Sequence, residues 1–288
     1  MIRIVEVGPR DGLQNEAAWV PTEAKVAYVD LLSASGLQEI EVSSFVAPEW
    51  VPQLADAAAV FAGLARRPGV RYTALVPNQR GLARAVASRV DGVSVFTAAS
   101  ETFCRKNINA SIAESLDRFR PVVAESPVPV RGYVSTAFHC PFEGPVAPAA
   151  VLKVTADLLA MGCAEISLGD TIGRARVEEV ERLLDALLPH CPVERLALHL
   201  HDTFGGAVAN AQAGAAMGIR TFDGSTGGLG GCPYAPGAPG NVATEALVQA
   251  FAGHTGVDQA VLEQAADLIR PYLTARAPTE IKTGRTAW

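Results

Sequence analysis

The feature that most constrains the fold is a regular alternation of strand-like and helix-like segments along the chain. Eight short apolar or β-branched runs are separated by Ala-, Leu- and Glu-rich stretches whose apolar residues recur with helical spacing. The starts of these runs span 217 residues, from Ile2 to Ile219, in seven intervals with a mean of 31, the length of one strand–helix unit. The expected strands are Ile2–Val7, Glu39–Ser43, Arg71–Val76, Gly92–Phe96, Val130–Thr136, Ala164–Leu168, Leu196–His201 and Ile219–Asp223. The clearest expected helices are Thr22–Ser35, Ser111–Glu125, Ala149–Met161, Val177–Leu188 and Gly206–Met217.

Glycines mark the ends of these helices and support the same division. Gly36, Gly162 and Gly218 each come just before a strand, as glycines in left-handed helix C-caps do. Eight consecutive units predict an α/β protein with a (β/α)₈ TIM barrel over about residues 1–250, followed by a C-terminal helical segment and tail over about 251–288. No linker interrupts the series, so we expect residues 1–288 to form a single catalytic domain. The main competitor is an open doubly wound sheet, but no G-x-G-x-x-G motif follows the first strand.

Composition excludes several classes of protein. Of the 288 residues 49% are hydrophobic and 19% are charged, so the chain can bury a large core. The formal charge of −6 argues against nucleic acid or an anionic membrane as a partner. No apolar run reaches the roughly 18 residues of a membrane span, and the first strand leaves no room for a signal peptide. The five cysteines are widely spaced, so we expect a cytoplasmic protein with reduced thiols.

A barrel fold predicts that function lies at the carboxyl ends of the strands. The seventh expected strand ends in ALHLHD, which places His199 and His201 two residues apart. Side chains two apart on a strand project to the same face, so both imidazoles should point into the barrel mouth while Leu198 and Leu200 face the helices. Two histidines in this position are expected to bind a metal or to transfer protons.

The loops after the first and last strands carry the next candidates. Arg10 and Asp11 follow the first strand directly, although Pro-x-x-Gly there is also ordinary turn chemistry. Glu6 lies on that strand, where a carboxylate requires a partner. Six of the 26 glycines fall between Gly227 and Gly240, in a loop that contains Cys232 and could form a lid. Asn241 closes this loop at the start of a helix, and Glu245 follows four residues later on the expected same helical face.

Other polar residues near strand ends complete the candidates. Glu41 lies near the end of the second strand, and Asp170 follows the sixth, where a capping role is the simpler interpretation. Arg105, Lys106 and Asn107 follow the fourth strand and could meet an anionic substrate, although a solvated loop explains them equally well.

Carboxylate, imidazole and carboxamide groups from three strand ends suit a divalent cation with water-filled positions. Such a mixed set favours Mg²⁺ or Mn²⁺ over Zn²⁺. Arg10 and Cys232 would add a fixed cation and a possible proton donor to this site. The expected ligand set is Asp11, His199, His201 and Asn241.

These motifs together resemble one family, the 3-hydroxy-3-methylglutaryl-CoA lyases. The similarity extends from the first strand to about Leu247, and RDGLQNE by itself would indicate only the wider superfamily of metal-dependent barrel lyases and acyltransferases. Two positions depart from the family pattern, since Glu49 replaces a usual Lys and Gly206 a frequent Gln. The motifs are RDGLQNE (10–16), SFVAPEWVPQLAD (44–56), KNIN (106–109), SLGDTIG (167–173), HLHDTFG (199–205) and GGLGGCPYAPGAPGN (227–241).

The resemblance implies an enzyme that cleaves 3-hydroxy-3-methylglutaryl-CoA to acetoacetate and acetyl-CoA. It also implies that an acyl-CoA thioester is the small-molecule partner and that the protein is a homodimer or larger homo-oligomer. It implies that Asp11, His201 and Asn241 are cation ligands beside His199. It also implies that Arg10 and Cys232 are catalytic and that the general base is His199 or Asp11. The matching acidic positions near the site are Glu6, Glu41, Asp170 and Glu245.

Alternative functions remain open at this point. A lyase for a larger 3-hydroxy-3-alkylglutaryl-CoA and a Claisen-type acyl-CoA synthase belong to the same superfamily, but such synthases usually carry a long C-terminal region, and only some 40 residues follow Leu247 here. A non-catalytic barrel that binds metal or acyl-CoA would be expected to lack an acid, base or arginine. A metal-dependent hydrolase with an H-x-H strand usually has that pair on its first strand.

Overall fold

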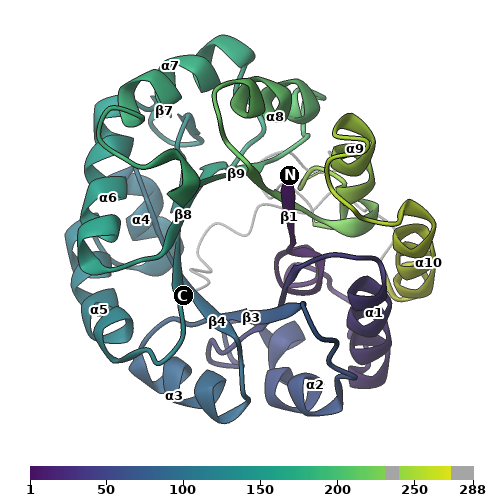
Figure 1. Ribbon diagram of the computed structural model, residues 1–288. Helices are drawn as coiled ribbons and strands as arrows, with labels where there is room; N and C mark the ends of the chain where they lie inside the picture. The colour runs from purple at the N-terminus through teal and green to yellow at the C-terminus, as the bar shows by residue number, and fades with distance from the viewer. Residues whose placement is uncertain (231–239, 274–288) are drawn as a thin grey trace.

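The strands form a closed parallel barrel, seen along its axis in Figure 1. The computed structural model describes residues 1–230 and 240–273. The order around the barrel is β1-β10-β9-β8-β5-β4-β3-β2, so the first and last strands pair and leave no edge. All eight predicted strands are confirmed, with ends within two residues of those expected. They are β1 (Arg3–Glu6), β2 (Glu39–Ser44), β3 (Arg71–Leu75), β4 (Gly92–Ala98), β5 (Val130–Ser135), β8 (Glu165–Asp170), β9 (Leu196–Leu200) and β10 (Thr221–Gly224).

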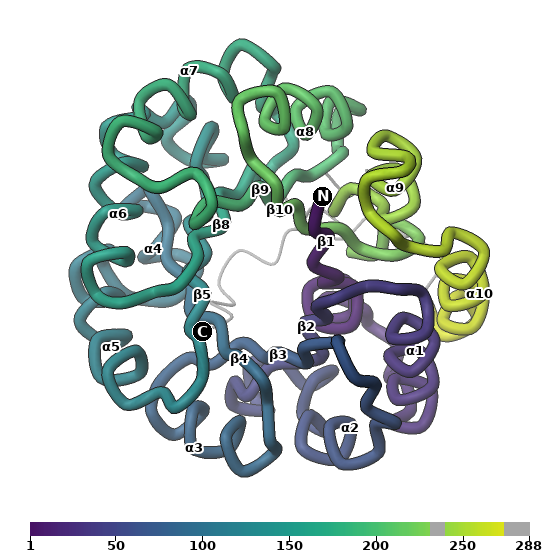
Figure 2. The backbone as a smooth tube through the Cα atoms, viewed as in Figure 1, coloured from purple at the N-terminus to yellow at the C-terminus, as the bar shows by residue number. Residues whose placement is uncertain are grey.

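Helices surround the barrel, as the tube in Figure 2 shows. The five helices expected from apolar spacing are confirmed, and α10 packs against α1 and α9. Gly36, Gly162 and Gly218 have the positive φ angles predicted for left-handed caps, at 92°, 114° and 105°. The helices are α1 (Thr22–Ala34), α2 (Ala57–Gly63), α3 (Gln79–Ala87), α4 (Glu101–Ile108), α5 (Ile112–Glu125), α6 (Pro148–Met161), α7 (Val177–Leu187), α8 (Ala207–Ala216), α9 (Thr244–Ala250) and α10 (Gln259–Ile269).

The two faces of each strand meet different surroundings. On β9, Leu198 and Leu200 are buried in the apolar layer, and a Cβ on Gly214 of α8 would lie only 2.4 Å from Leu198 Cδ1. His199 faces the opposite way and lines a cavity at the barrel mouth, as its two-residue spacing from His201 predicts. The barrel interior is therefore where the polar strand residues gather.

Charged side chains line the amino-terminal end of the lumen, around a cavity of about 200 Å³. Arg3 pairs with Glu39 of β2 and Glu165 of β8, and Glu39 also pairs with Arg71. Arg131 of β5 is the register partner of Glu165, with its Nε 2.8 Å from Glu165 Oε1, although its N–H is not aimed at that oxygen. Buried charges need partners of this kind because desolvation is costly.

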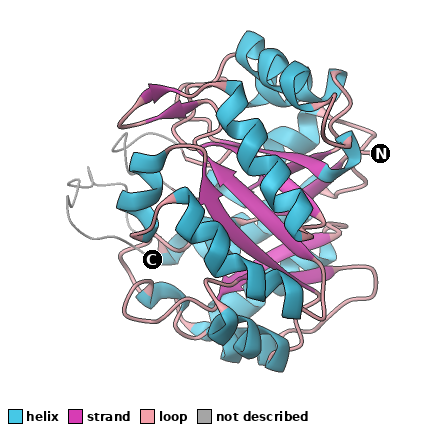
Figure 3. Ribbon diagram, turned by 90° about the vertical axis from the view of Figure 1, so that its left-hand side faces the viewer, coloured by secondary structure: helices cyan, strands magenta, loops and turns pink. Residues whose placement is uncertain are grey.

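Two local structures were not predicted. Gly8–Gly12 form one turn of π-helix after β1, where Pro-x-x-Gly suggested a simple tight turn. A small antiparallel hairpin, β6 (His139–Cys140) and β7 (Gly144–Pro145), follows β5. Figure 3 shows this hairpin at the end of the molecule opposite the N-terminus. It extends the barrel rim beside the mouth.

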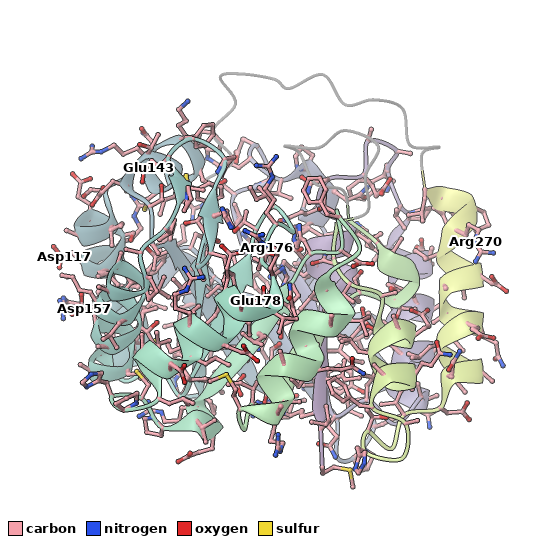
Figure 4. The ribbon with its side chains drawn as sticks, turned by 90° about the horizontal axis from the view of Figure 1, so that it is seen from above. Asp117, Glu143, Asp157, Arg176, Glu178 and Arg270 are labelled. Atoms are coloured by element: carbon pink, nitrogen blue, oxygen red, sulfur yellow. The ribbon has the colours of Figure 1, made fainter. Side chains whose placement is uncertain are left out.

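The outer surface carries charges of both signs. Figure 4 shows Asp117, Asp157 and Arg270 at the periphery of the helical ring, pointing away from the barrel. In residues 1–230 and 240–273, no helix is long and apolar enough to cross a membrane. Four cysteines in the same ranges are buried free thiols, namely Cys104, Cys140, Cys163 and Cys191.

We predict that Gly36→Ala destabilises the protein by about 2 kcal/mol or more. Gly36 has a φ of 92°, and an added Cβ would lie 2.5 Å from the backbone oxygen of Gly256. The matched control is Gly69→Ala, because Gly69 has a φ of 83° with nothing within 4 Å of an added Cβ. That variant should lose only about 1 kcal/mol from backbone strain. Urea unfolding measures both, and equal losses would contradict the proposed contact.

Candidate active site

A cavity of about 220 Å³ opens at the carboxyl ends of the strands. Its lining includes the polar side chains of Arg10, Asp11, His199 and His201. Its lining also includes apolar side chains, among them Leu75, Phe96, Phe103 and Trp50. A pocket lined by both charged and apolar side chains suits a ligand that combines a charged head with an apolar part.

The π-turn after β1 presents Arg10 and Asp11 to this cavity. The backbone N–H groups of Arg10, Asp11 and Gly12 all donate to the Val7 carbonyl oxygen, at 2.7–3.2 Å. Arg10 forms ion pairs through its Nη1 with Asp11 and through its Nε with Glu41. These two carboxylates outweigh the effect of burial and raise the pKa of Arg10 above its ordinary value. The guanidinium is therefore a permanent, oriented positive charge.

Asp11, His199 and His201 form a cluster that could hold a divalent cation. One ligand atom from each lies within 4.8 Å of the others. Burial and the neighbouring His199 lower the pKa of His201 to about 4, so its imidazole is neutral at physiological pH. Although burial opposes it, the charge of Arg10 together with His199 lowers the pKa of Asp11. A neutral imidazole and an ionised carboxylate are the forms that bind metals.

Three buried atoms in or beside this cluster lack hydrogen-bond partners among the described residues. They are Nδ1 of His201, Oδ1 of Asn241 and Oε1 of Gln14, whose Nε2 donates to Asp11 Oδ1 at 2.9 Å. The other amide atom of Asn241, Nδ2, donates to Asp11 Oδ2 at 2.8 Å and to the Leu229 carbonyl at 3.2 Å. Gly230 closes this region, since a Cβ there would lie 2.8 Å from Asn241 Nδ2. Unpartnered buried acceptors beside a carboxylate fit a bound cation.

The position of Asn241 differs from the sequence-based expectation. α9 begins at Thr244 with Ala243 as its N-cap, so Asn241 precedes the helix and forms an isolated bridge with His201. The prediction that Asn241 and Glu245 share a helical face is therefore wrong. The carboxylate of Glu245 accepts hydrogen bonds from the Gly227 N–H at 2.9 and 3.0 Å. Glu245 thus anchors the start of the glycine-rich segment.

Glu6 is fully buried behind the π-turn and accepts hydrogen bonds from four donors. Its Oε1 accepts from the N–H groups of Gly8 and Thr226, and its Oε2 from the hydroxyls of Thr226 and Thr244. A Cβ on Gly8 would lie 2.6 Å from Oε1, so glycine is required there. Burial raises the pKa of Glu6 to about 7 despite these donors. The carboxyl group joins β1 to the β10–α9 connection.

The remaining acidic candidates have different surroundings. Glu41 contacts Arg10, the Ser94 hydroxyl and, at 3.3 Å, the hydroxyl of Tyr133. Asp170 accepts from the N–H groups of residues 174 and 175 and shapes the loop after β8, in agreement with a capping role. Burial raises the pKa of Asp170 to about 6.

The three residues expected to contact CoA lie on α4 but have different surroundings. Asn107 lines the mouth cavity. Lys106 Nζ lies 4.1 Å from the ring centroid of Phe142 on the hairpin loop. Arg105 is exposed and lies 3.9 Å from Glu101 of its own helix. Cys232, the expected proton donor, lies outside the described residues.

Sequence reasoning missed a buried group beneath His199. Asp223 of β10 accepts from His199 Nδ1 at 3.2 Å and from Arg131 Nη2 at 2.7 Å. Tyr133 lies between this pair and Glu41. The two-residue spacing of Arg131 and Tyr133 on β5 could have placed these two side chains on one face, as it did for the histidines, but it gives no signal for Asp223.

The fold and the site define a (β/α)₈ barrel with a carboxylate–imidazole cluster, which could hold a cation, and a fixed arginine at its mouth. The family model described as HMGL-like matches residues 1–269, and the chain belongs to this family. The *Pseudomonas aeruginosa* "3-hydroxy-3-isohexenylglutaryl-CoA/hydroxy-methylglutaryl-CoA lyase" is 52% identical over 93% of this chain and 91% of its own length. The mitochondrial hydroxymethylglutaryl-CoA lyase of *Rattus norvegicus* is 49% identical over 97% of this chain and 88% of its own.

A solved structure agrees with these relatives. The HMG-CoA lyase from *Brucella melitensis* superimposes with a TM-score of 0.93 at 47% identity, over 95% of this chain and 99% of that one. A cytoplasmic 3-hydroxy-3-methylglutaryl-CoA lyase of *Rattus norvegicus* is also 50% identical over 93% of this chain and 80% of its own length. Relatives thus occur in both the mitochondrion and the cytoplasm, so the expected cytoplasmic location stays a prediction.

We predict that Glu6→Gln changes how stability depends on pH. Between the ordinary pKa of 4.5 and the folded value of about 7, folded Glu6 keeps a proton that the unfolded chain has lost. Stability conferred by this proton is therefore lost as pH rises through that window, by up to about 3 kcal/mol. Glutamine does not titrate, so the variant should gain stability relative to the wild type over the same range.

Urea unfolding across that pH range checks this prediction. Glu178→Gln is the matched control, because Glu178 is exposed on α7 and its loss should leave the pH dependence unchanged. Identical pH profiles for the wild type and Glu6→Gln would contradict the protonation of a buried Glu6.

Proposed function

We propose that this protein is a cation-dependent lyase that cleaves 3-hydroxy-3-methylglutaryl-CoA to acetoacetate and acetyl-CoA. The observation that carries the proposal is the pair of buried, unpartnered ligand atoms, His201 Nδ1 and Asn241 Oδ1, beside Asp11. Arg10 lies directly next to this cluster through its ion pair with Asp11. The names of relatives about 50% identical over nearly the whole chain support the same reaction.

Asp11, His201 and Asn241 would hold the cation, with His199 beside them. Oxygen and nitrogen ligands of this kind favour Mg²⁺ or Mn²⁺. When bound, a divalent cation lowers the pKa of a coordinated hydroxyl group and orients the substrate.

Side chains of this protein would carry out the proton transfers and stabilise the developing charge. Cleavage of the carbon–carbon bond removes the proton of a tertiary alcohol and releases the enolate of a thioester. His199 or Asp11, both at the cavity wall, would accept that proton. Arg10, held by Glu41 and Asp11, would stabilise the negative charge that develops on the thioester oxygen. Cys232 is the proposed donor to the enolate carbon.

The apolar wall of the cavity bears on the choice of substrate. Leu75, Phe96 and Phe103 line the same cavity as the charged residues and would accommodate a 3-methyl or longer 3-alkyl group. The *Pseudomonas* relative is named for an isohexenyl substrate as well as the methyl one. A lyase for larger 3-hydroxy-3-alkylglutaryl-CoA substrates is therefore the second candidate.

Three further expectations belong to this proposal. We propose that residues 1–288 work as one catalytic domain and that Asn107, with Lys106 and Arg105, contacts CoA. A homodimer or larger homo-oligomer remains a prediction from the family resemblance. Light scattering on the purified protein would determine its state.

We predict that the purified protein with Mg²⁺ releases acetoacetate from 3-hydroxy-3-methylglutaryl-CoA and that exhaustive chelation abolishes this activity. Arg10→Gln should lower kcat by about 10³-fold or more, because the charge that stabilises the enolate is lost. Mn²⁺ binding, measured by calorimetry, should persist in this variant because Arg10 is not a ligand.

The matched control is Arg176→Gln, since Arg176 is exposed at the start of α7 and should leave turnover unchanged. Activity that survives chelation would contradict the cation site, and a wild-type rate in Arg10→Gln would contradict the role of Arg10. A protein that binds Mn²⁺ but cleaves neither this thioester nor longer 3-alkyl analogues would be a binding barrel instead.

A further inference from the structure

Asp223 is a fully buried carboxylate whose two oxygens are both occupied. Its Oδ1 accepts a hydrogen bond from Arg131 Nη2 at 2.7 Å. Its Oδ2 accepts from the Ser167 hydroxyl at 2.8 Å and lies 3.2 Å from His199 Nδ1. The side chain of Asp223 is 0% exposed, so no solvent competes for these contacts.

The charge on Asp223 decides which atom of His199 carries a proton. Asp223 Oδ1 and Arg131 Nη2 form a buried ion pair at 2.7 Å, and the adjacent guanidinium favours the ionised carboxylate. An ionised carboxylate only accepts hydrogen bonds, so His199 Nδ1 must be the donor. In the neutral imidazole this leaves Nε2 with its lone pair free for the cavity.

Arg131 connects this arrangement to the other side of the site. Its Nη1 donates to the Tyr133 hydroxyl at 3.0 Å, and that hydroxyl lies 3.3 Å from Glu41 Oε2. The same Glu41 oxygen accepts from Arg10 Nε. One buried arginine is therefore linked to His199 through Asp223 and to Arg10 through Tyr133 and Glu41.

We propose that Asp223 and Arg131 are positioning residues, in which Asp223 fixes the Nδ1–H tautomer of His199 and Arg131 keeps Asp223 in the orientation that does so. This inference rests on the role proposed above for His199. Neither residue lines the mouth cavity, so both act through the side chains that do.

The stability of the barrel does not explain why Asp223 and Arg131 are buried as a charged pair. A buried ion pair adds little stability compared with well-packed apolar residues, because desolvation offsets the attraction. The neighbouring strand β1 contributes an apolar residue, Val5, at the same register as Asp223. A charged pair kept beneath a histidine of the site is therefore explained by orientation more directly than by stability.

Asp223→Asn tests the proposal because its amide has one accepting side and one donating side. Arg131 can only donate, so the amide oxygen must face Arg131 and the NH₂ group must face His199. Nδ1 then becomes the acceptor and the proton moves to Nε2. Nitrogen-15 NMR of histidine-labelled, Mg²⁺-loaded protein at mildly alkaline pH reports this tautomer directly for each of the five histidines.

We expect His199 to be the Nδ1–H tautomer in the wild type and the Nε2–H tautomer in Asp223→Asn. In Asp223→Asn, kcat should fall on the order of 10²-fold or more, while KM should change far less. The matched control is Glu39→Gln, which neutralises another buried lumen carboxylate at the barrel base. That variant should keep the wild-type tautomer and kcat. Arg131→Lys, which keeps the positive charge, should retain more of the Nδ1–H tautomer than Arg131→Met.

An Nε2–H tautomer in the wild type, or an unchanged Nδ1–H tautomer in folded Asp223→Asn, would overturn the proposal. So would an equal loss of kcat in Glu39→Gln. The NMR result does not depend on the substrate. A wild-type protein with the expected tautomers but without lyase activity would therefore contradict only the proposed function.

Discussion

Ion pairing inside the barrel lumen is the constraint on which the site depends. A closed barrel excludes solvent from its interior, so each charge there requires a partner of opposite sign or several hydrogen bonds. Such contacts begin at the base of the barrel, where Arg3 forms an ion pair with Glu39. They continue to the mouth, where Glu41 pairs with Arg10 and Asp223 contacts His199. The groups proposed to react are thus oriented by the same contacts that make their burial possible.

The proposed cation site follows from how three distant segments meet. The π-turn after β1 supplies Asp11, the end of β9 supplies the histidines, and the segment before α9 supplies Asn241 through its bridge with His201. Parallel strands place their carboxyl ends at one rim, so ligands far apart in the sequence converge there. Glu6 joins two of these segments from behind, since its four donors come from β1–turn and β10–α9 residues.

Much of the fold could be predicted because its signals are local. Apolar runs and left-handed glycines located the strands and helix ends, and the two-residue spacing of His199 and His201 indicated their shared face. The predicted helical relation of Asn241 and Glu245 was wrong, because the bridge to His201 delays the helix until Thr244. The Asp223–His199 contact could not be predicted, since it depends on the register between two strands rather than on either strand alone.

We propose that a divalent cation at the barrel mouth is bound by imidazole nitrogen as well as by carboxylate and amide oxygen. Pulsed EPR of bound Mn²⁺ in protein labelled with nitrogen-15 histidine measures this most directly. We expect coupling to a directly bound imidazole nitrogen that disappears in His201→Ala. Spectra with only oxygen ligands in the wild-type protein would contradict it.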